Sequence, residues 1–136
     1  MLFRSENLAF TDLKLINNVL LGVKKDSTGR IAWVKVTEAV LKKYKPHIDL
    51  SDNILNFVRS LKGVEVSLIF REINSQEKNI RVNLRSQGRV DVNKIAQHFG
   101  GGGHKTSSGI TLRRTNIKDA ERKVISFVKK ALSGNK

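Results

Sequence analysis

The 136-residue chain has 39% hydrophobic residues, one proline and no cysteine, which is typical of one folded domain and excludes disulfides and thiolate metal sites. No apolar run approaches the roughly 20 residues that cross a bilayer, and the opening MLFRSENLAF lacks the apolar core of a signal peptide, so we expect a cytoplasmic protein without a membrane partner. The net charge of +14 lies mostly in residues 77–136, which hold 14 basic and 4 acidic residues, and it favours a phosphate-bearing partner over a merely solvated basic surface.

The first third of the chain predicts two helices around a strand. Within residues 10–25, apolar side chains recur at every third or fourth position, as in an amphipathic helix. The members of this stripe are Leu13, Ile16, Val19, Leu20 and Val23. A strand rich in β-branched residues follows at 30–37, and Thr37 caps a short helix over 38–44.

The middle of the chain predicts a helix followed by two strands. The helix covers 52–61, with Ser51 or Asp52 as its cap. The strands cover 64–72 and 79–86, and the polar connection between them could close a hairpin.

The last third predicts two more helices and one more strand. A short helix over 91–99 ends where four glycines occupy positions 100–103. A strand follows at 109–114, and Asn116 caps a helix over 117–132. The whole pattern indicates a small mixed α/β domain with about four strands.

The run Gly100 to Gly103, followed by His104 and Lys105, is the first candidate binding element. Without Cβ atoms, several successive backbone N–H groups can approach one anion. His104 adds a hydrogen-bond donor, and Lys105 adds a mobile positive charge. The alternative is a permissive turn beside a surface histidine, because loose glycine motifs often occur without a ligand. The spacing is neither that of a Walker loop nor that of a Rossmann fold.

Arginines end two of the predicted strands. Arg85, followed by Ser86, ends one, while Arg113 and Arg114 end the other. Strand ends commonly present ligand-binding groups, and arginine can hold phosphate by two parallel hydrogen bonds. For Arg113 and Arg114 we favour the alternative of solvated edge residues. Phe99 could stack on a base, but we favour a place in the core, as is usual for an aromatic at the end of an amphipathic helix.

The acidic residues do not predict a hydrolytic centre. A two-metal site needs several carboxylates, often with histidines, brought close together. The 12 acidic residues are scattered, and the sequence contains no Asp-x-Asp, His-His or His-x-x-x-His pattern. No pair of nucleophile and base is evident either. We therefore expect no catalytic residue, metal or cofactor in this chain, and interpret it as a binding domain.

The segment GGGHKTSSG, residues 101–109, resembles the GGGHxxAAG signature of the DHHA1 domain. That domain is the carboxyl-terminal, substrate-binding half of many DHH-family phosphoesterases. Further segments resemble the branch of oligoribonucleases, phosphoadenosine-phosphate phosphatases and RecJ-like enzymes: GRIAWVKVT, NFVRSLKGVEVSLIFRE, LRS and VDVNKIAQHFGGGGHK. The likeness extends from about Leu8 onward, and Ser107 and Ser108 replace the usual Ala-Ala pair.

The resemblance implies one α/β domain over residues 11–136, with a mixed sheet of roughly five strands flanked by helices, after a linker remnant at 1–10. It also implies a larger enzyme, whose DHH domain holds two manganese ions and hydrolyses a phosphate ester across a shared cleft. This chain alone would then be inactive, and its partner would be a DHH domain of the same parent chain or of a separate subunit. Whether the chain is excised or naturally separate, and whether it forms a homodimer, stays open.

The resemblance also implies which residues contact the substrate. It places four loop residues close to the substrate phosphate: Gly101, Gly102, Gly103 and His104. Lys105 would add its positive charge beside them. Arg85 and Ser86 would hold another phosphate or the terminal nucleotide. The ligand would be short RNA or DNA or a nucleotide phosphate, with nanoRNA, cyclic-dinucleotide products, phosphoadenosine phosphate and polyphosphate left open. The alternatives are a stand-alone RNA- or DNA-binding module, like the related domain of alanyl-tRNA synthetases, and a docking domain without substrate contact.

Overall fold

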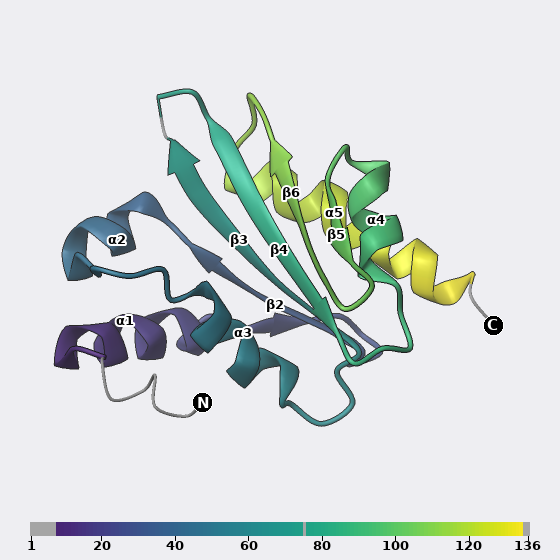
Figure 1. Ribbon diagram of the computed structural model, residues 1–136, viewed down its shortest axis with the longest axis horizontal. Coiled ribbons are helices and arrows are strands. Elements are labelled where there is room, and N and C mark those ends of the chain that lie inside the picture. The colour runs from purple at the N-terminus through teal and green to yellow at the C-terminus, as the bar shows by residue number, and fades with distance from the viewer. Residues whose placement is uncertain (1–7, 75, 135–136) are drawn as a thin grey trace.

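Five helices and six strands follow one another in residues 8–74 and 76–134, the part of the chain that the computed structural model describes (Figure 1). The helices are α1 (Phe10–Leu21), α2 (Glu38–Tyr44), α3 (Ser51–Arg59), α4 (Val92–His98) and α5 (Ile117–Ser133). The strands are β1 (Lys24–Lys25), β2 (Ile31–Val36), β3 (Val66–Asn74), β4 (Asn79–Ser86), β5 (Gly102–His104) and β6 (Ser107–Leu112). The predicted α/β class is confirmed.

The six strands form one mixed sheet in the order β1-β2-β3-β4-β6-β5. β2 and β3 are parallel, and the other neighbouring strands are antiparallel. A parallel pair needs a crossover connection, which α2 and α3 provide here. β3 and β4 pair directly, as the predicted hairpin requires.

The sheet has six strands because two short strands lie at its edges beside the four that the sequence pattern predicted, which is one more than the roughly five that the resemblance implied. β1 consists of two lysines that pair with Ala32 and Trp33, and β5 begins in the glycine run. Lysine and glycine are both depleted in strands. Only the pairing with β2 and β6 makes these segments extended, so local sequence preference did not predict them.

The boundaries and faces of two helices also differ from the prediction. α1 ends at Leu21, and the outer members of the predicted stripe, Leu13 and Val23, are 55% and 40% exposed. Ile16 and Val19 are buried as predicted, and Leu15 takes the place of Leu13 on this face, because the face meets the sheet and the neighbouring helices. α3 ends at Arg59, two residues before the predicted end.

Side-chain caps fix the beginnings of several helices. Thr37 Oγ1 accepts from Val40 N at the start of α2, and the Asn116 side chain accepts from Asp119 N at the start of α5, as predicted. The predicted cap of α3 was wrong. Its N-cap is Leu50, whose side chain makes no capping bond.

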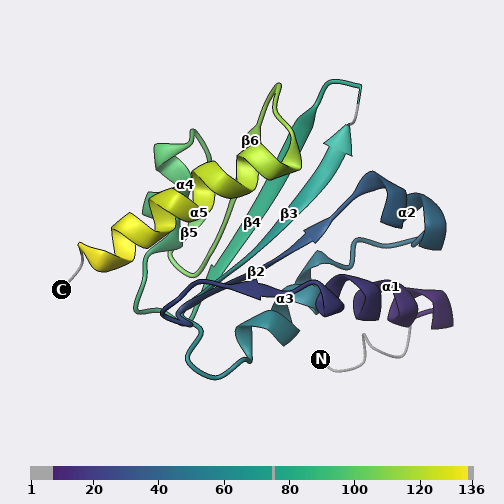
Figure 2. The same cartoon turned by 180° about the vertical axis from the view of Figure 1, so that it is seen from behind.

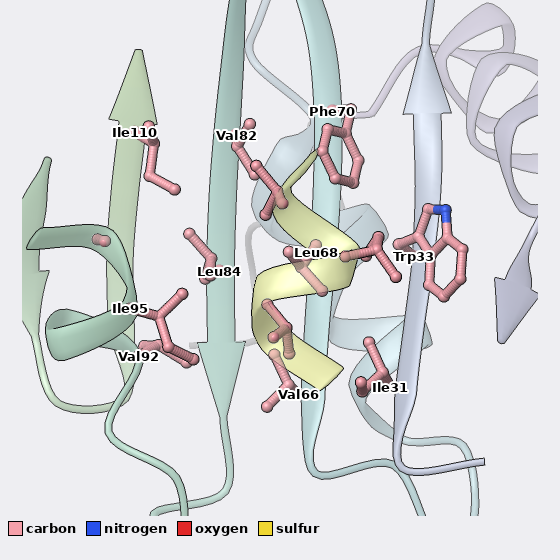
Figure 3. Close-up of a cluster of buried hydrophobic side chains, with 14 of the residues drawn as sticks. Ile31, Trp33, Val66, Leu68, Phe70, Val82, Leu84, Val92, Ile95 and Ile110 are labelled. Carbon is pink, nitrogen blue, oxygen red and sulfur yellow. The ribbon is translucent and has the colours of Figure 1, made fainter. Parts of the chain in front are cut away.

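The two faces of the sheet carry separate apolar clusters (Figures 1 and 2). On one face, α4 and α5 pack on side chains from β2, β3, β4 and β6, and Figure 3 shows Val66, Leu68 and Phe70 of β3 beside a helix segment that crosses them. On the other face, α1, α2 and α3 pack on β2 and on Ile69 of β3. This second cluster includes no residue of β4, β6 or β5. Half of that face is therefore left to polar side chains.

Glu121 joins α5 to the sheet through three side chains. Its carboxylate accepts from Trp33 Nε1 at 2.6 Å and lies 3.3 Å from Lys24 Nζ and 3.4 Å from Lys35 Nζ. Burial alone would raise the pKa of the Glu121 carboxyl, but hydrogen bonds from Trp33 and Lys24 and the charges of both lysines outweigh it. The pKa therefore lies below its ordinary value. Such a carboxylate stabilises the fold above its unfolded pKa, and this stabilisation is lost as the pH falls through the folded pKa.

We expect the free energy of unfolding to fall as the pH is lowered below about 4.3, the ordinary pKa of a glutamate carboxyl, because protonated Glu121 no longer attracts the two lysines. Glu121→Gln keeps an acceptor for Trp33 but removes the charge, so it should lower stability at neutral pH and weaken the acid dependence. Urea unfolding of both proteins at neutral pH and at about pH 3 measures this difference. Equal acid losses in the two proteins would contradict the role of Glu121.

No helix in the described ranges is long and apolar enough to cross a membrane.

Candidate functional site

The glycine run connects α4 to β5 through close backbone contacts. Gly100 N donates to Gln97 O at 3.0 Å, and Gly101 N donates to Ala96 O at 2.8 Å. Gly103 N donates to Asn93 Oδ1 at 3.0 Å. Because these three N–H groups are already bound within the domain, they do not form the free cradle of donors that the sequence suggested.

The glycines are instead required by the close approach of β5 to β6. A Cβ at Gly101 would overlap the carbonyl oxygen of Gly109 and lie 3.0 Å from Ile110 Cα. A Cβ at Gly103 would lie 2.6 Å from Ser107 O. These atoms belong to the backbone and cannot move aside as a flexible side chain can. The phosphate-binding role of the glycine run stays a prediction. That prediction now depends mainly on the adjacent His104 side chain.

His104 ends β5 at the edge of the sheet, and its side chain is exposed. The Ser108 hydroxyl donates to His104 O at 2.7 Å, so one of the two serines that replace the usual alanines fixes the backbone beside this histidine. Lys105 is also exposed, and its carbonyl oxygen accepts from Val92 N at 2.8 Å. Both side chains are thus free to extend from an anchored backbone.

The structure brings Arg85 and His104 to the same face of the sheet. Arg85 pairs with Ser107, which in turn pairs with His104, and residues directly opposite in a sheet share a face. Two strand spacings, about 10 Å, separate the Arg85 and His104 backbones. Arg85 Nη2 donates to Asp52 Oδ1 at 2.6 Å, and Nη1 donates to Leu84 O at 3.0 Å.

Ser86 does not share this face, because successive strand residues point to opposite sides. Its side chain is buried, and its hydroxyl donates to Val90 O at 2.7 Å and accepts from Gly88 N at 3.3 Å. The hydroxyl therefore holds the loop between β4 and α4. The expectation that Ser86 contacts phosphate beside Arg85 is contradicted by this geometry.

Two arginines that the sequence analysis did not single out extend over the same face. Arg81 Nη1 donates to Thr111 Oγ1 at 3.0 Å, and the Arg81 guanidinium occupies the space where a Cβ of Gly109 would lie. Arg71 Nη2 donates to Asn83 Oδ1 at 3.1 Å. In the sequence, Arg81, Asn83 and Arg85 alternate with Val82 and Leu84, a pattern typical of a strand with one solvent-exposed face, and this was the available signal. The residues that lie beside this face on the other strands could not be identified without knowing how the strands pair.

We call the uncovered half of the sheet that carries Arg71, Arg81, Arg85 and His104 the arginine face. Figure 1 shows that the helix layers leave β4 and β6 uncrossed on the side nearer the viewer. Two of its arginines pair with carboxylates on its rim, Arg85 with Asp52 at 2.6 Å and Arg71 with the neighbouring Asp49 at 3.4 Å. These carboxylate side chains are 78% and 65% exposed. The pairs are therefore open to competition from an incoming anion.

The charge of Asp49 is maintained by its neighbours. Burial alone would raise the pKa of the Asp49 carboxyl, but hydrogen bonds from Ser51 and the charge of Arg71 outweigh this effect and hold the pKa below its ordinary value. Asp49 is thus an anion near neutral pH, and an anionic ligand at Arg71 would compete with it.

The other candidates lie away from the arginine face. Arg113 and Arg114 are exposed and lie beyond the end of β6 that is remote from His104, as expected of solvated edge residues. Phe99 packs edge-to-face on Phe127 with ring centroids 5.4 Å apart, at the border of the apolar cluster under α5. Phe99 is thus partly buried against the core, as the preferred interpretation required in part, and its stacking on a base stays a prediction.

Within the described residues, no three His, Asp or Glu side chains lie close enough together to hold a metal ion. Asp49 and Asp52, the two carboxylates on the rim of the arginine face, are each engaged by an arginine. The donor set of the described residues therefore does not fit a two-metal hydrolytic centre.

Comparisons with known proteins agree with this architecture. The family model of the DHHA1 domain matches residues 30–132. The bifunctional oligoribonuclease and PAP phosphatase NrnA of Thermus thermophilus is 32% identical over 83 residues, which are 61% of this chain and 25% of that protein. NrnA of Mycoplasma genitalium is 31% identical over 102 residues, 75% of this chain and 30% of its own. The crystal structure of an exopolyphosphatase-related protein from Bacteroides fragilis matches 95% of this chain and 36% of its own, with a TM-score of 0.79 at 25% identity.

Proposed function

Because the chain belongs to the DHHA1 domain family, we propose that it is the substrate-binding domain of a DHH-family, manganese-dependent phosphoesterase that acts on short oligonucleotides or nucleotide phosphates. The observation that carries the proposal is the arginine face, where Arg85 and His104 share one uncovered side of the sheet. The names of the NrnA relatives, oligoribonuclease and PAP phosphatase, support a nucleotide ligand. The chain spans only 25% and 30% of those proteins, so the whole enzyme's activity belongs to the proposal.

In this proposal the chain binds and orients the phosphate ester and does not cleave it. Arg85 offers a planar donor fork for phosphate oxygens, and His104 offers an imidazole N–H from the neighbouring edge strand. The two manganese ions that activate water would be held by a separate DHH domain, in the same cytoplasmic parent chain or in another subunit. The arginine face would then close one side of the cleft in which hydrolysis occurs.

A second candidate function is the binding of longer RNA, and the outer surface of α5 favours it. In Figure 2, α5 lies on the viewer's side of the sheet. Its exposed basic residues are Lys118, Arg122, Lys123, Lys129 and Lys130. A row of solvated cations attracts a nucleic-acid backbone without reading its ends.

Titration of the chain with 5′-phosphorylated single-stranded RNA of increasing length separates the two functions. The arginine face predicts that affinity rises from one to a few nucleotides and then levels off, with a shallow dependence on salt. Binding along α5 predicts affinity that keeps rising with length, with a salt slope of about −0.7 per contacted phosphate on a logarithmic scale. The continued rise would contradict the proposed function, and the absence of binding at every length would favour a docking domain.

A further inference from the structure

Arg71 and Arg81 lie directly opposite one another in the pairing of β3 with β4. Like charges at opposite positions of an antiparallel pair destabilise the sheet unless something compensates them. Asp49 compensates only Arg71, through one contact of 3.4 Å from a largely exposed carboxylate. No carboxylate of the described residues forms an ion pair with Arg81. Among the described residues, the pair therefore has one more positive charge than its ion pairs neutralise.

Both guanidinium groups are held in place over the arginine face. Arg71 reaches from β3 over β4 to Asn83, and Arg81 reaches from β4 over β6 to Thr111. Gly109 is buried, and any side chain there would collide with the Arg81 guanidinium, so this glycine makes the room in which Arg81 lies. Arg81 is held by the neutral Thr111, and Arg71 is held by the neutral Asn83 and by the largely exposed Asp49. Two cations ordered in this way, with donors left over, form a preorganised site for an anion.

We propose that Arg71 and Arg81 form a second phosphate subsite, which holds the next phosphate of a nucleotide chain whose first phosphate lies at Arg85 and His104. The inference rests on the proposed function, because it extends the same face. Arg81 and Arg85 are four residues apart on β4, and their Cα atoms are therefore about 13 Å apart. The two arginines therefore occupy separate positions along the face.

The surroundings of Arg71 favour nucleotides over inorganic polyphosphate. A cavity of about 220 Å³ opens beside Arg71, between the sheet and the three amino-terminal helices. Most of its wall is apolar, with contributions from Leu41, Pro46, Ile48 and Ile69. An apolar wall beside a phosphate subsite can take the flat face of a nucleobase, whereas polyphosphate has no apolar part to place there.

The test is a titration of wild-type chain and Arg81→Gln with AMP and with a 5′-phosphorylated adenosine dinucleotide. Loss of a charge-assisted hydrogen bond should weaken dinucleotide binding by about 10- to 100-fold but change AMP binding by less than about twofold. The matched control is Arg113→Gln, which removes the same charge from an exposed residue beyond the end of β6, outside both proposed binding surfaces. It should leave both affinities within about twofold of wild type. Arg81→Lys, which keeps the charge but not the fork, should bind the dinucleotide with intermediate affinity, and thermal unfolding checks that each variant is folded.

Each other result has a defined meaning. Equal losses for AMP and the dinucleotide in Arg81→Gln would place Arg81 in the first subsite and overturn the second. Unchanged dinucleotide affinity would also overturn it, while wild-type binding of both ligands would leave the proposed function standing. Failure of wild-type chain to bind either ligand would overturn both proposals. Tripolyphosphate binding that matches the dinucleotide in strength and in dependence on Arg81 would overturn the assignment to a nucleotide chain.

Discussion

Gly101→Ala is expected to lower the free energy of unfolding by about 3 kcal/mol, near the upper end of the usual cost of overpacking. The added Cβ would overlap the carbonyl oxygen of Gly109 and press on Ile110 Cα, which lies in β6. Neither backbone atom can move without separating β5 from β6 or distorting their pairing. Since His104 lies at the end of β5, the same substitution should also weaken nucleotide binding. Urea unfolding followed by circular dichroism measures the first effect, and titration with AMP measures the second.

The neighbouring glycines provide the controls. At Gly102 a Cβ would meet only Asn93 Oδ1, at 3.4 Å, so Gly102→Ala should change stability far less than Gly101→Ala. Gly100 has a φ of +81° and open space around it, so Gly100→Ala should cost about 1–2 kcal/mol through its left-handed backbone alone. Similar losses at all three positions would show that general flexibility of the loop, and not contact with β6, explains the run of glycines.

The elements with strong local patterns could be predicted from the sequence. The strand 79–86 was predicted with the bounds that β4 has, and the helix over 117–132 differs from α5 by one residue. β1 and β5 could not be predicted, because lysine and glycine favour no strand by themselves and become extended only through their partners. The linker predicted at residues 1–10 stays a prediction, and its first seven residues lie outside the described ranges.

The site could be predicted only where one local segment or a known signature carried it. His104 was found through its glycine run, and Arg85 through its place at the end of a strand. Arg81 was missed because its importance depends on Gly109, which lies beneath its guanidinium but 28 positions along the chain. Ser86 was misplaced because adjacent strand residues point to opposite faces, and its hydroxyl serves the loop that follows.

The rim carboxylates, Asp49 and Asp52, explain how the arginine side chains can stay ordered when no ligand is bound. Exposed ion pairs such as Arg85 with Asp52 contribute only about 0–1 kcal/mol. A phosphate group forms stronger, charge-assisted hydrogen bonds with the same fork. Replacement of the carboxylate by phosphate is therefore favourable, and the pair keeps Arg85 extended over the face in the meantime.

His104→Ala is expected to weaken binding of AMP and of the phosphorylated dinucleotide alike, by about 10- to 100-fold, because both would lose the hydrogen bond to the first phosphate. His104 is exposed and ends an edge strand, so its removal leaves no cavity and should change stability little. A loss of binding without a loss of stability would therefore report a direct contact. Isothermal titration calorimetry measures the affinities, and thermal unfolding checks the fold.

The matched control is His47→Ala, because His47 is also exposed and lies in the loop between α2 and α3. Its loss should leave AMP binding within about twofold of wild type. Together with Arg81→Gln, the variant also tests how the two ends of the arginine face divide the ligand. If His104→Ala affected only the dinucleotide and Arg81→Gln affected AMP, the first phosphate would lie at Arg71 and Arg81, and the nucleotide chain would run in the opposite direction. If His104→Ala had no more effect than His47→Ala, the first subsite would consist of arginines alone, and the histidine of the glycine signature would need a role outside phosphate binding.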